Sequence, residues 1–129
     1  MERANGRIFG GVRSILRLEG LMLLAVSVAL YARLQGEWRL FAELFLVPDL
    51  SFVAYLFGPR AGAFAYNAMH STIGPLTLLS IGMFASLPMT APVALIWLAH
   101  VGFDRALGYG LKYPSAFADT HLGRIGRAP

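Results

Sequence analysis

Two histidines and two aspartates stand in the most apolar parts of this sequence: Asp49, His70, His100 and Asp104. An ionisable group near the centre of a bilayer costs roughly 2.5–3.5 kcal/mol on insertion scales, before it finds a partner. His100 and Asp104 are four residues apart, so a helix places them on the same face. The sequence therefore predicts that the four side chains converge on a shared interior, where they satisfy one another, an ion or water.

Imidazole and carboxylate groups together suit a divalent zinc, manganese or iron ion. Such an ion lowers the pKa of a bound water to about 7 and so makes a nucleophile at neutral pH. The predicted metal ligands are Asp49, His70, His100 and Asp104, with His121 in the C-terminal tail as a further ligand. Asp49 and Asp104 are also the candidate catalytic residues, because a carboxylate can orient the attacking water.

Two other interpretations of the same residues stay open. In the first, the cluster is structural: His100 pairs with Asp104, and Asp49 bonds His70 to tie two helices together. In the second, the two imidazoles bind a haem or a pigment axially, although neighbouring carboxylates fit that role less well.

The composition points to the environment of these residues. Of the 129 residues, 57% are hydrophobic and only 14% are charged, against about 25% charged residues in a soluble domain. There is no cysteine. These values exclude a disordered chain, a disulfide scaffold and a nucleic-acid-binding domain, so we expect no nucleic-acid partner. The chain is predicted to be an integral membrane protein in contact with the lipid bilayer.

The elements that must position the cluster are apolar helices. Residues 61 to 103 contain no Asp, Glu, Lys or Arg, and this length holds two crossings of about 20 residues each. Pro88 and Pro92 mark the turn between them, and Gly74-Pro75 predicts a kink in the first. The sequence thus predicts an all-α, four-helix membrane bundle with spans at about 15–34, 38–57, 61–86 and 91–111.

Charge at the two ends predicts the orientation. The chain is predicted to be a single transmembrane domain, 1–129, which includes a basic N-terminal tail at 1–14 and a C-terminal tail at 112–129. Basic residues favour the cytoplasmic side. We therefore expect a multi-pass protein of the bacterial inner membrane with both termini in the cytoplasm. At 1.5 Å per residue, Asp49 lies about 16 Å and His70 about 14 Å inside their spans, close to the midplane.

The C-terminal part has a distinctive sequence, with GYGLKY at 108–113 and THLG at 120–123. We expect it to fold back as a cap over the cytoplasmic mouth of the bundle. These two runs are similar to those of an uncharacterised family of small bacterial membrane proteins, defined only as a domain of unknown function. The resemblance covers about residues 15–126 and implies a four-helix membrane fold, without an activity.

A second resemblance is to the membrane-bound, LexA-regulated metal-dependent hydrolases. It is carried by three elements in the same order: Pro48-Asp49, His70-Ser71, and His100 followed by Asp104. It implies metal binding and hydrolysis at these positions. In that family another acid and a histidine follow the first Asp, where this chain has Ser51 and Phe52. A second histidine also precedes the His-Ser element, where this chain has Ala65.

Two function hypotheses follow. The first is a metal-binding, hydrolase-like membrane protein with its site at the midplane. The second is a non-catalytic accessory subunit of a larger redox or photosynthetic membrane complex, in which the polar cluster is structural and other membrane subunits are the partners.

Overall fold

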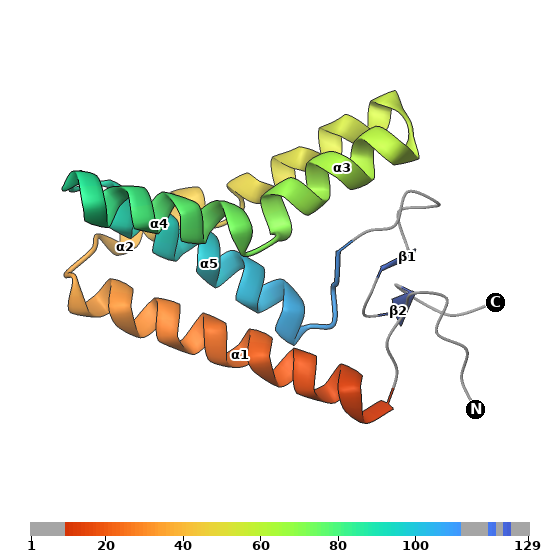
Figure 1. Ribbon diagram of the computed structural model, residues 1–129, viewed down its shortest axis with the longest axis horizontal. Helices are drawn as coiled ribbons and strands as arrows, with labels where there is room; N and C mark the ends of the chain where they lie inside the picture. The colour runs from red at the N-terminus through yellow and green to blue at the C-terminus, as the bar shows by residue number, and fades with distance from the viewer. Residues whose placement is uncertain (1–9, 112–118, 121–122, 125–129) are drawn as a thin grey trace.

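The computed structural model describes residues 10–111, 119–120 and 123–124 of the chain. Within these ranges the fold is helical, with five α-helices and one 3₁₀-helix, and two short antiparallel strands of two residues each pair Asp119 with Arg124 and Thr120 with Gly123 (Figure 1). The elements are α1 (Gly10–Arg33), α2 (Trp38–Leu44), η1 (Val47–Phe57), α3 (Pro59–His70), α4 (Ile73–Ala85), α5 (Thr90–Ala106), β1 (Asp119–Thr120) and β2 (Gly123–Arg124).

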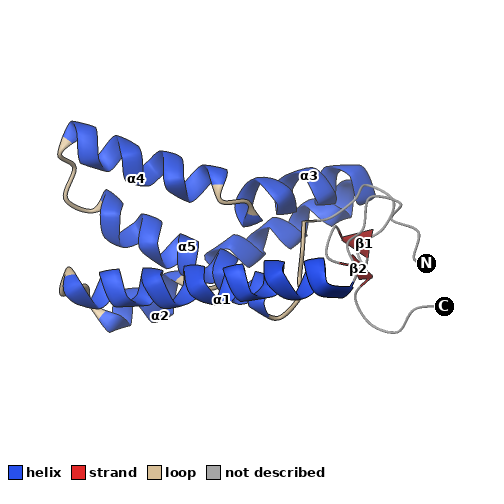
Figure 2. Cartoon of the chain, turned by 60° about the horizontal axis from the view of Figure 1, so that its bottom comes forward, coloured by secondary structure: helices blue, strands red, loops and turns tan. Residues whose placement is uncertain are grey.

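Helix α5 is the centre of the molecule. It lies between α1 and α4 (Figures 1 and 2), and its residues 94–96 and 98–102 are all buried. Glycines bring α1 and α5 into close contact: a Cβ added at Gly102 would lie 2.7 Å from the Gly20 carbonyl oxygen. The 3₁₀-helix η1, which follows α2, packs on α3 instead. His100 and Asp104 are therefore carried by the best-packed helix of the fold.

The surface of the described residues is strongly apolar. Large side chains such as Leu56, Phe57, Phe64 and Phe84 are between 78% and 91% exposed. Helix α1 and the continuous segment Trp38–Phe57 are each long and apolar enough to cross a membrane, and the bent pair α3–α4 makes a third candidate if it counts as one span. Side chains of this kind are stable outside a core only when lipid or another protein covers them. The chain therefore has the surface of a membrane protein.

The predicted second and third spans are not single regular helices. In the second, α2 ends at Leu44 and the chain continues as the 3₁₀-helix η1, in which Pro48 occupies the first turn. A proline inside a helix has no N–H to donate, and its ring clashes with the carbonyl four residues earlier. For Pro48 that carbonyl belongs to Leu44, which explains where α2 stops.

Pro75 has the same effect on the third span. Its ring opposes the carbonyl of Ser71, and the helix is interrupted at Ser71 and Thr72 with a bend of 40°. The prediction of a bend was right, but its position at Gly74-Pro75 was wrong by one turn. His70 is consequently the last residue of α3.

The fourth predicted span is shorter than expected. Helix α5 ends at Ala106, not at residue 111, because Gly108 adopts a φ of 93° and turns the chain. The Tyr109 N–H donates to the Asp104 carbonyl and the Gly108 N–H to the Arg105 carbonyl, which is the Schellman pattern of helix termination. Because α5 has 17 residues, only two or three of the described helices meet the length for a crossing, and the four-crossing bundle stays a prediction.

The beginning of α1 and the end of α5 lie at the same end of the molecule. Arg17 Nε donates to the Ala106 carbonyl oxygen at 2.9 Å. This contact agrees with an even number of membrane passes between the beginning of α1 and the end of α5. It does not indicate on which side of the membrane they lie. Most of the expected C-terminal cap, residues 112–118, 121–122 and 125–129, lies outside the described residues.

Candidate metal centre

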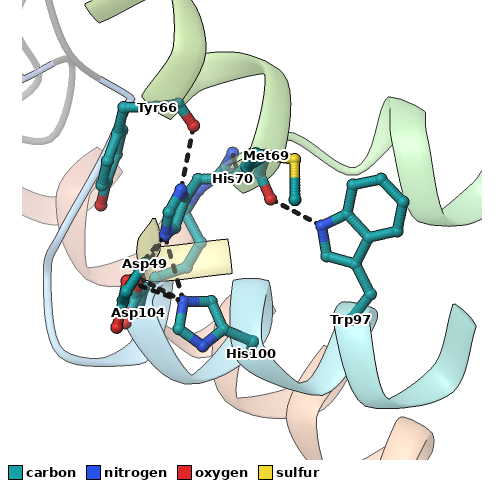
Figure 3. Close-up of polar contacts among 8 residues, drawn as sticks. Asp49, Tyr66, Met69, His70, Trp97, His100 and Asp104 are labelled. Carbon is teal, nitrogen blue, oxygen red and sulfur yellow. Dashed lines mark hydrogen bonds and ion pairs between the residues drawn. The ribbon is translucent and has the colours of Figure 1, made fainter. Parts of the chain in front are cut away.

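Four side chains from three separate parts of the chain meet at one point (Figure 3). Each offers one potential ligand atom, and all four atoms lie within 4.8 Å of one another. The residues are Asp49 of η1, His70 of α3, and His100 and Asp104 of α5. The structure thus brings together the four residues that the sequence singled out.

The five distances between ligand atoms that involve a histidine are nearly equal. The two Nε2 atoms of His70 and His100 are 3.1 Å apart. Asp49 Oδ1 lies 3.1 Å from His70 Nε2 and 3.2 Å from His100 Nε2. Asp104 Oδ2 lies 3.4 Å and 3.3 Å from the same two atoms. Five of the six edges of a tetrahedron are therefore between 3.1 and 3.4 Å long.

Five of these separations have the size found around a metal ion. In a regular tetrahedron the centre lies about 0.61 of an edge from each corner, so edges of 3.1–3.4 Å correspond to about 1.9 to 2.1 Å from centre to corner. Zinc binds histidine nitrogen at about 2.0–2.1 Å and carboxylate oxygen at about 2.0–2.2 Å. The sixth separation, between the ligand oxygens of Asp49 and Asp104, is at most 4.8 Å, so the match rests on the five separations that involve a histidine.

The orientation of His70 is fixed by the helix that carries it. Its Nδ1 donates a hydrogen bond to the carbonyl of Tyr66, one turn earlier, at 2.9 Å. The ring of Tyr66 stacks on the imidazole with a centroid separation of 3.8 Å and an interplanar angle of 7°. Because a carbonyl can only accept, the proton is on Nδ1 and the lone pair of Nε2 faces the cluster. Metal-binding histidines are commonly held by such a hydrogen bond.

His100 and Asp104 share one face of α5, as their spacing predicts. The side chain of His100 is 1% exposed and that of Asp104 14%. The Phe45 ring packs edge-on against the His100 imidazole at 5.3 Å. His100 Nδ1 makes no hydrogen bond of normal geometry among the described residues, and the Phe45 backbone carbonyl is its neighbouring acceptor. Its environment therefore favours Nε2 as the atom that faces the cluster.

Asp49 differs from the other three residues in its exposure. It occupies the first turn of η1, directly after Pro48, and its side chain is 35% exposed. Within the described residues, the two histidines of the cluster are buried, Asp104 is 14% exposed and Asp49 is its most exposed member.

The charges in the cluster require a cation or protons. With neutral imidazoles and ionised carboxylates, the four groups carry a charge of −2. The Nε2 lone pairs of the two histidines also face each other at 3.1 Å. A divalent ion would cancel the carboxylate charge and accept both lone pairs, whereas protons on the imidazoles would give a hydrogen-bonded structural network. Both arrangements are compatible with burial, because each leaves the cluster neutral.

Two side chains of α5 that the sequence did not single out contact the end of α3 beside the cluster. Trp97 donates from Nε1 to the Met69 carbonyl at 2.6 Å. Arg105 donates from its guanidinium to the His70 carbonyl at 3.3 Å. The sequence signal for a role of Trp97 is its position on α5, three residues before the predicted ligand His100. The fifth predicted ligand, His121, lies outside the described residues.

Comparison with known proteins places the chain in a family without assigning it an activity. No curated protein matches it. No solved structure matches it either. A family described as a domain of unknown function (DUF4260) matches residues 13–125, which include all four residues of the cluster. The chain therefore belongs to the DUF4260 family.

Proposed function

We propose that this chain is a membrane protein that binds one divalent ion of the zinc class through Asp49, His70, His100 and Asp104. The observation that carries the proposal is the convergence of four ligand atoms, of which five separations are 3.1–3.4 Å and the sixth is at most 4.8 Å. Two imidazoles and two carboxylates are ligands that zinc, manganese and iron accept. The ion would also neutralise two carboxylates in an apolar environment, where unpaired charge is costly.

Elemental analysis of the purified full chain in detergent tests this proposal. We expect stoichiometric metal in the wild type and its loss in His100→Ala. Glu43→Gln is the matched control, because Glu43 is an acid in the same apolar segment as Asp49 that is 58% exposed and pairs with Arg39 instead. His121→Ala tests the predicted fifth ligand. A wild type that stays free of metal after incubation with zinc would refute the proposal and favour a structural cluster.

We further propose that the bound ion supports a hydrolytic activity. When bound, a zinc-class ion supplies Lewis acidity and a water of lowered pKa. Because four protein ligands would fill a tetrahedral site, the catalytic form needs one position for a water. Asp49 is the most exposed member of the cluster, and we assign it to yield that position to the water and to accept its proton. Asp104, which is more deeply buried, serves to hold the ion.

An apolar pocket beside the cluster supports a lipidic substrate for such an activity. It has a volume of about 220 Å³, and its walls include Pro48, Met69 and Trp97, which are neighbours in sequence or one turn away from three of the ligands. A hydrocarbon chain fits a pocket of this lining. Hydrolysis of an amphiphilic ester that is lost in Asp49→Asn, but not in Glu43→Gln, would test this form of the proposal.

The rival interpretation, an accessory subunit of a larger membrane complex, makes the opposite prediction for the same samples. It expects a metal-free protein that co-purifies with other subunits from native membranes.

A further inference from the structure

The interruption of the third span creates a problem of backbone hydrogen bonding next to the cluster. The last carbonyls of a helix have no partner within that helix, and in a membrane no bulk water replaces the missing partner. Helix α3 ends at His70 and α4 begins at Ile73. Two carbonyls at this end, those of Met69 and His70, accept hydrogen bonds from side chains of α5.

Both donors flank the ligands on α5. Trp97 is three residues before His100 and donates to Met69 at 2.6 Å (Figure 3). Arg105 directly follows Asp104 and donates to His70 at 3.3 Å. The end of α3 is therefore attached to α5 on each side of the His100–Asp104 pair.

Trp97 also contacts the other half of the broken span. A Cβ added at Gly74 of α4 would lie 2.5 Å from the indole ring, so the ring fits only because residue 74 is glycine. The indole thus binds the end of α3 with its N–H and packs on the beginning of α4 with its ring. No other described residue makes both of these contacts.

We propose that Trp97 is a positioning residue for the metal centre, an inference that rests on the proposed function. By holding the Met69 carbonyl against α5, it sets the distance between the Nε2 atoms of His70 and His100. His70 is the residue that most needs such support, because it stands at a free helix end beside a 40° bend. Ligands must be held within about 0.5 Å of their productive geometry for full affinity.

Zinc affinity of the full chain in detergent, measured by competition with a chromophoric chelator, tests the inference. Trp97→Phe keeps an aromatic ring against Gly74 and removes the N–H, and Gly74→Ala keeps the N–H and displaces the ring. Each is expected to weaken zinc binding about 10- to 100-fold while the stoichiometry stays the same, the range found for residues that orient metal ligands. Trp38→Phe is the matched control, because Trp38 is 51% exposed and belongs to α2.

A second readout separates positioning from general stability. Co²⁺ bound in place of zinc has a visible spectrum that depends on ligand geometry, and we expect a changed spectrum in Trp97→Phe and an unchanged one in Trp38→Phe. Zinc affinity of Trp97→Phe within twofold of the wild type would overturn the inference. Loss of the folded protein in this variant would overturn it too, because Trp97 would then support the whole fold. A wild type without zinc binding is a different result, which refutes the proposed function itself.

Discussion

The substitution Asp49→Asn distinguishes a metal centre from a structural network by the sign of its effect on stability. Asparagine has the shape of aspartate but no charge. In a metal centre, the two carboxylates repel each other until an ion binds, so the substitution should stabilise the metal-free protein. In a structural network, Asp49 is the hydrogen-bond partner of His70 and His100, so the substitution should destabilise it.

The size of the effect follows from the geometry. The ligand oxygens of Asp49 and Asp104 are at most 4.8 Å apart. At an effective dielectric constant of about 20, two unit charges at this distance repel by about 3.5 kcal/mol. Because the Asp49 side chain is 35% exposed, solvent screening reduces this to roughly 1–3 kcal/mol. A change of this size corresponds to an increase in Tm of about 3–9 °C for a chain of this length.

Thermal unfolding in detergent at pH 9, after treatment with a chelator, is the assay. At this pH the imidazoles are least favoured to carry extra protons, so protons relieve the carboxylate repulsion least. Zinc added to about 100 times its Kd should then stabilise the wild type by about 2.7 kcal/mol and Asp49→Asn by much less. Glu43→Gln should leave both values unchanged, because an exposed ion pair contributes little.

The reasoning would be refuted by either of two results. One is a lower Tm of metal-free Asp49→Asn than of the wild type at pH 9. The other is a zinc-induced stabilisation of the variant equal to that of the wild type. The first would identify a structural His–Asp network, and the second would show that zinc binds elsewhere on the chain.

Three further predictions concern the site and its surroundings. Acidification should release zinc, with the affinity falling steeply below about pH 6, because protons compete for the imidazole nitrogens; a pH-independent affinity between pH 8 and 5 would contradict histidine ligation. In Trp38→Phe the remaining tryptophan is Trp97, so Co²⁺ should quench most of the fluorescence of this variant on binding. A quench seen in the wild type but lost in this variant would place the ion elsewhere. Gly102→Ala should destabilise the protein by about 1–3 kcal/mol, because its Cβ would meet the Gly20 carbonyl and the Leu24 N–H of α1. Thermal unfolding measures it, with Gly11→Ala as the control, because nothing lies within 4 Å of a Cβ added at Gly11.

Periodicity and apolar length were sufficient to predict the helical class and the membrane environment, and the resemblance to a family of unknown function is confirmed. They were not sufficient to predict where the individual helices begin and end. The sequence contains Pro48 and Pro75, but the consequence of a proline appears up to four residues earlier in the chain. The third span was therefore predicted as one kinked helix, although it is two helices.

The chemistry was visible in the sequence because ionisable residues are so costly in an apolar segment that each one needs a reason. That argument selects Asp49, His70, His100 and Asp104 without any knowledge of their contacts. It also indicates that His100 and Asp104 share a face, since both belong to one helix.

Only the tertiary structure decided that Asp49 and His70 reach this pair. The distances of 3.1–3.4 Å among the ligand atoms depend on how η1 and α3 pack against α5. The role of Trp97 depends on a carbonyl that is free because α3 ends at His70. Local sequence determines which face of a helix is polar, whereas the meeting of polar faces depends on contacts between residues that are far apart in the chain.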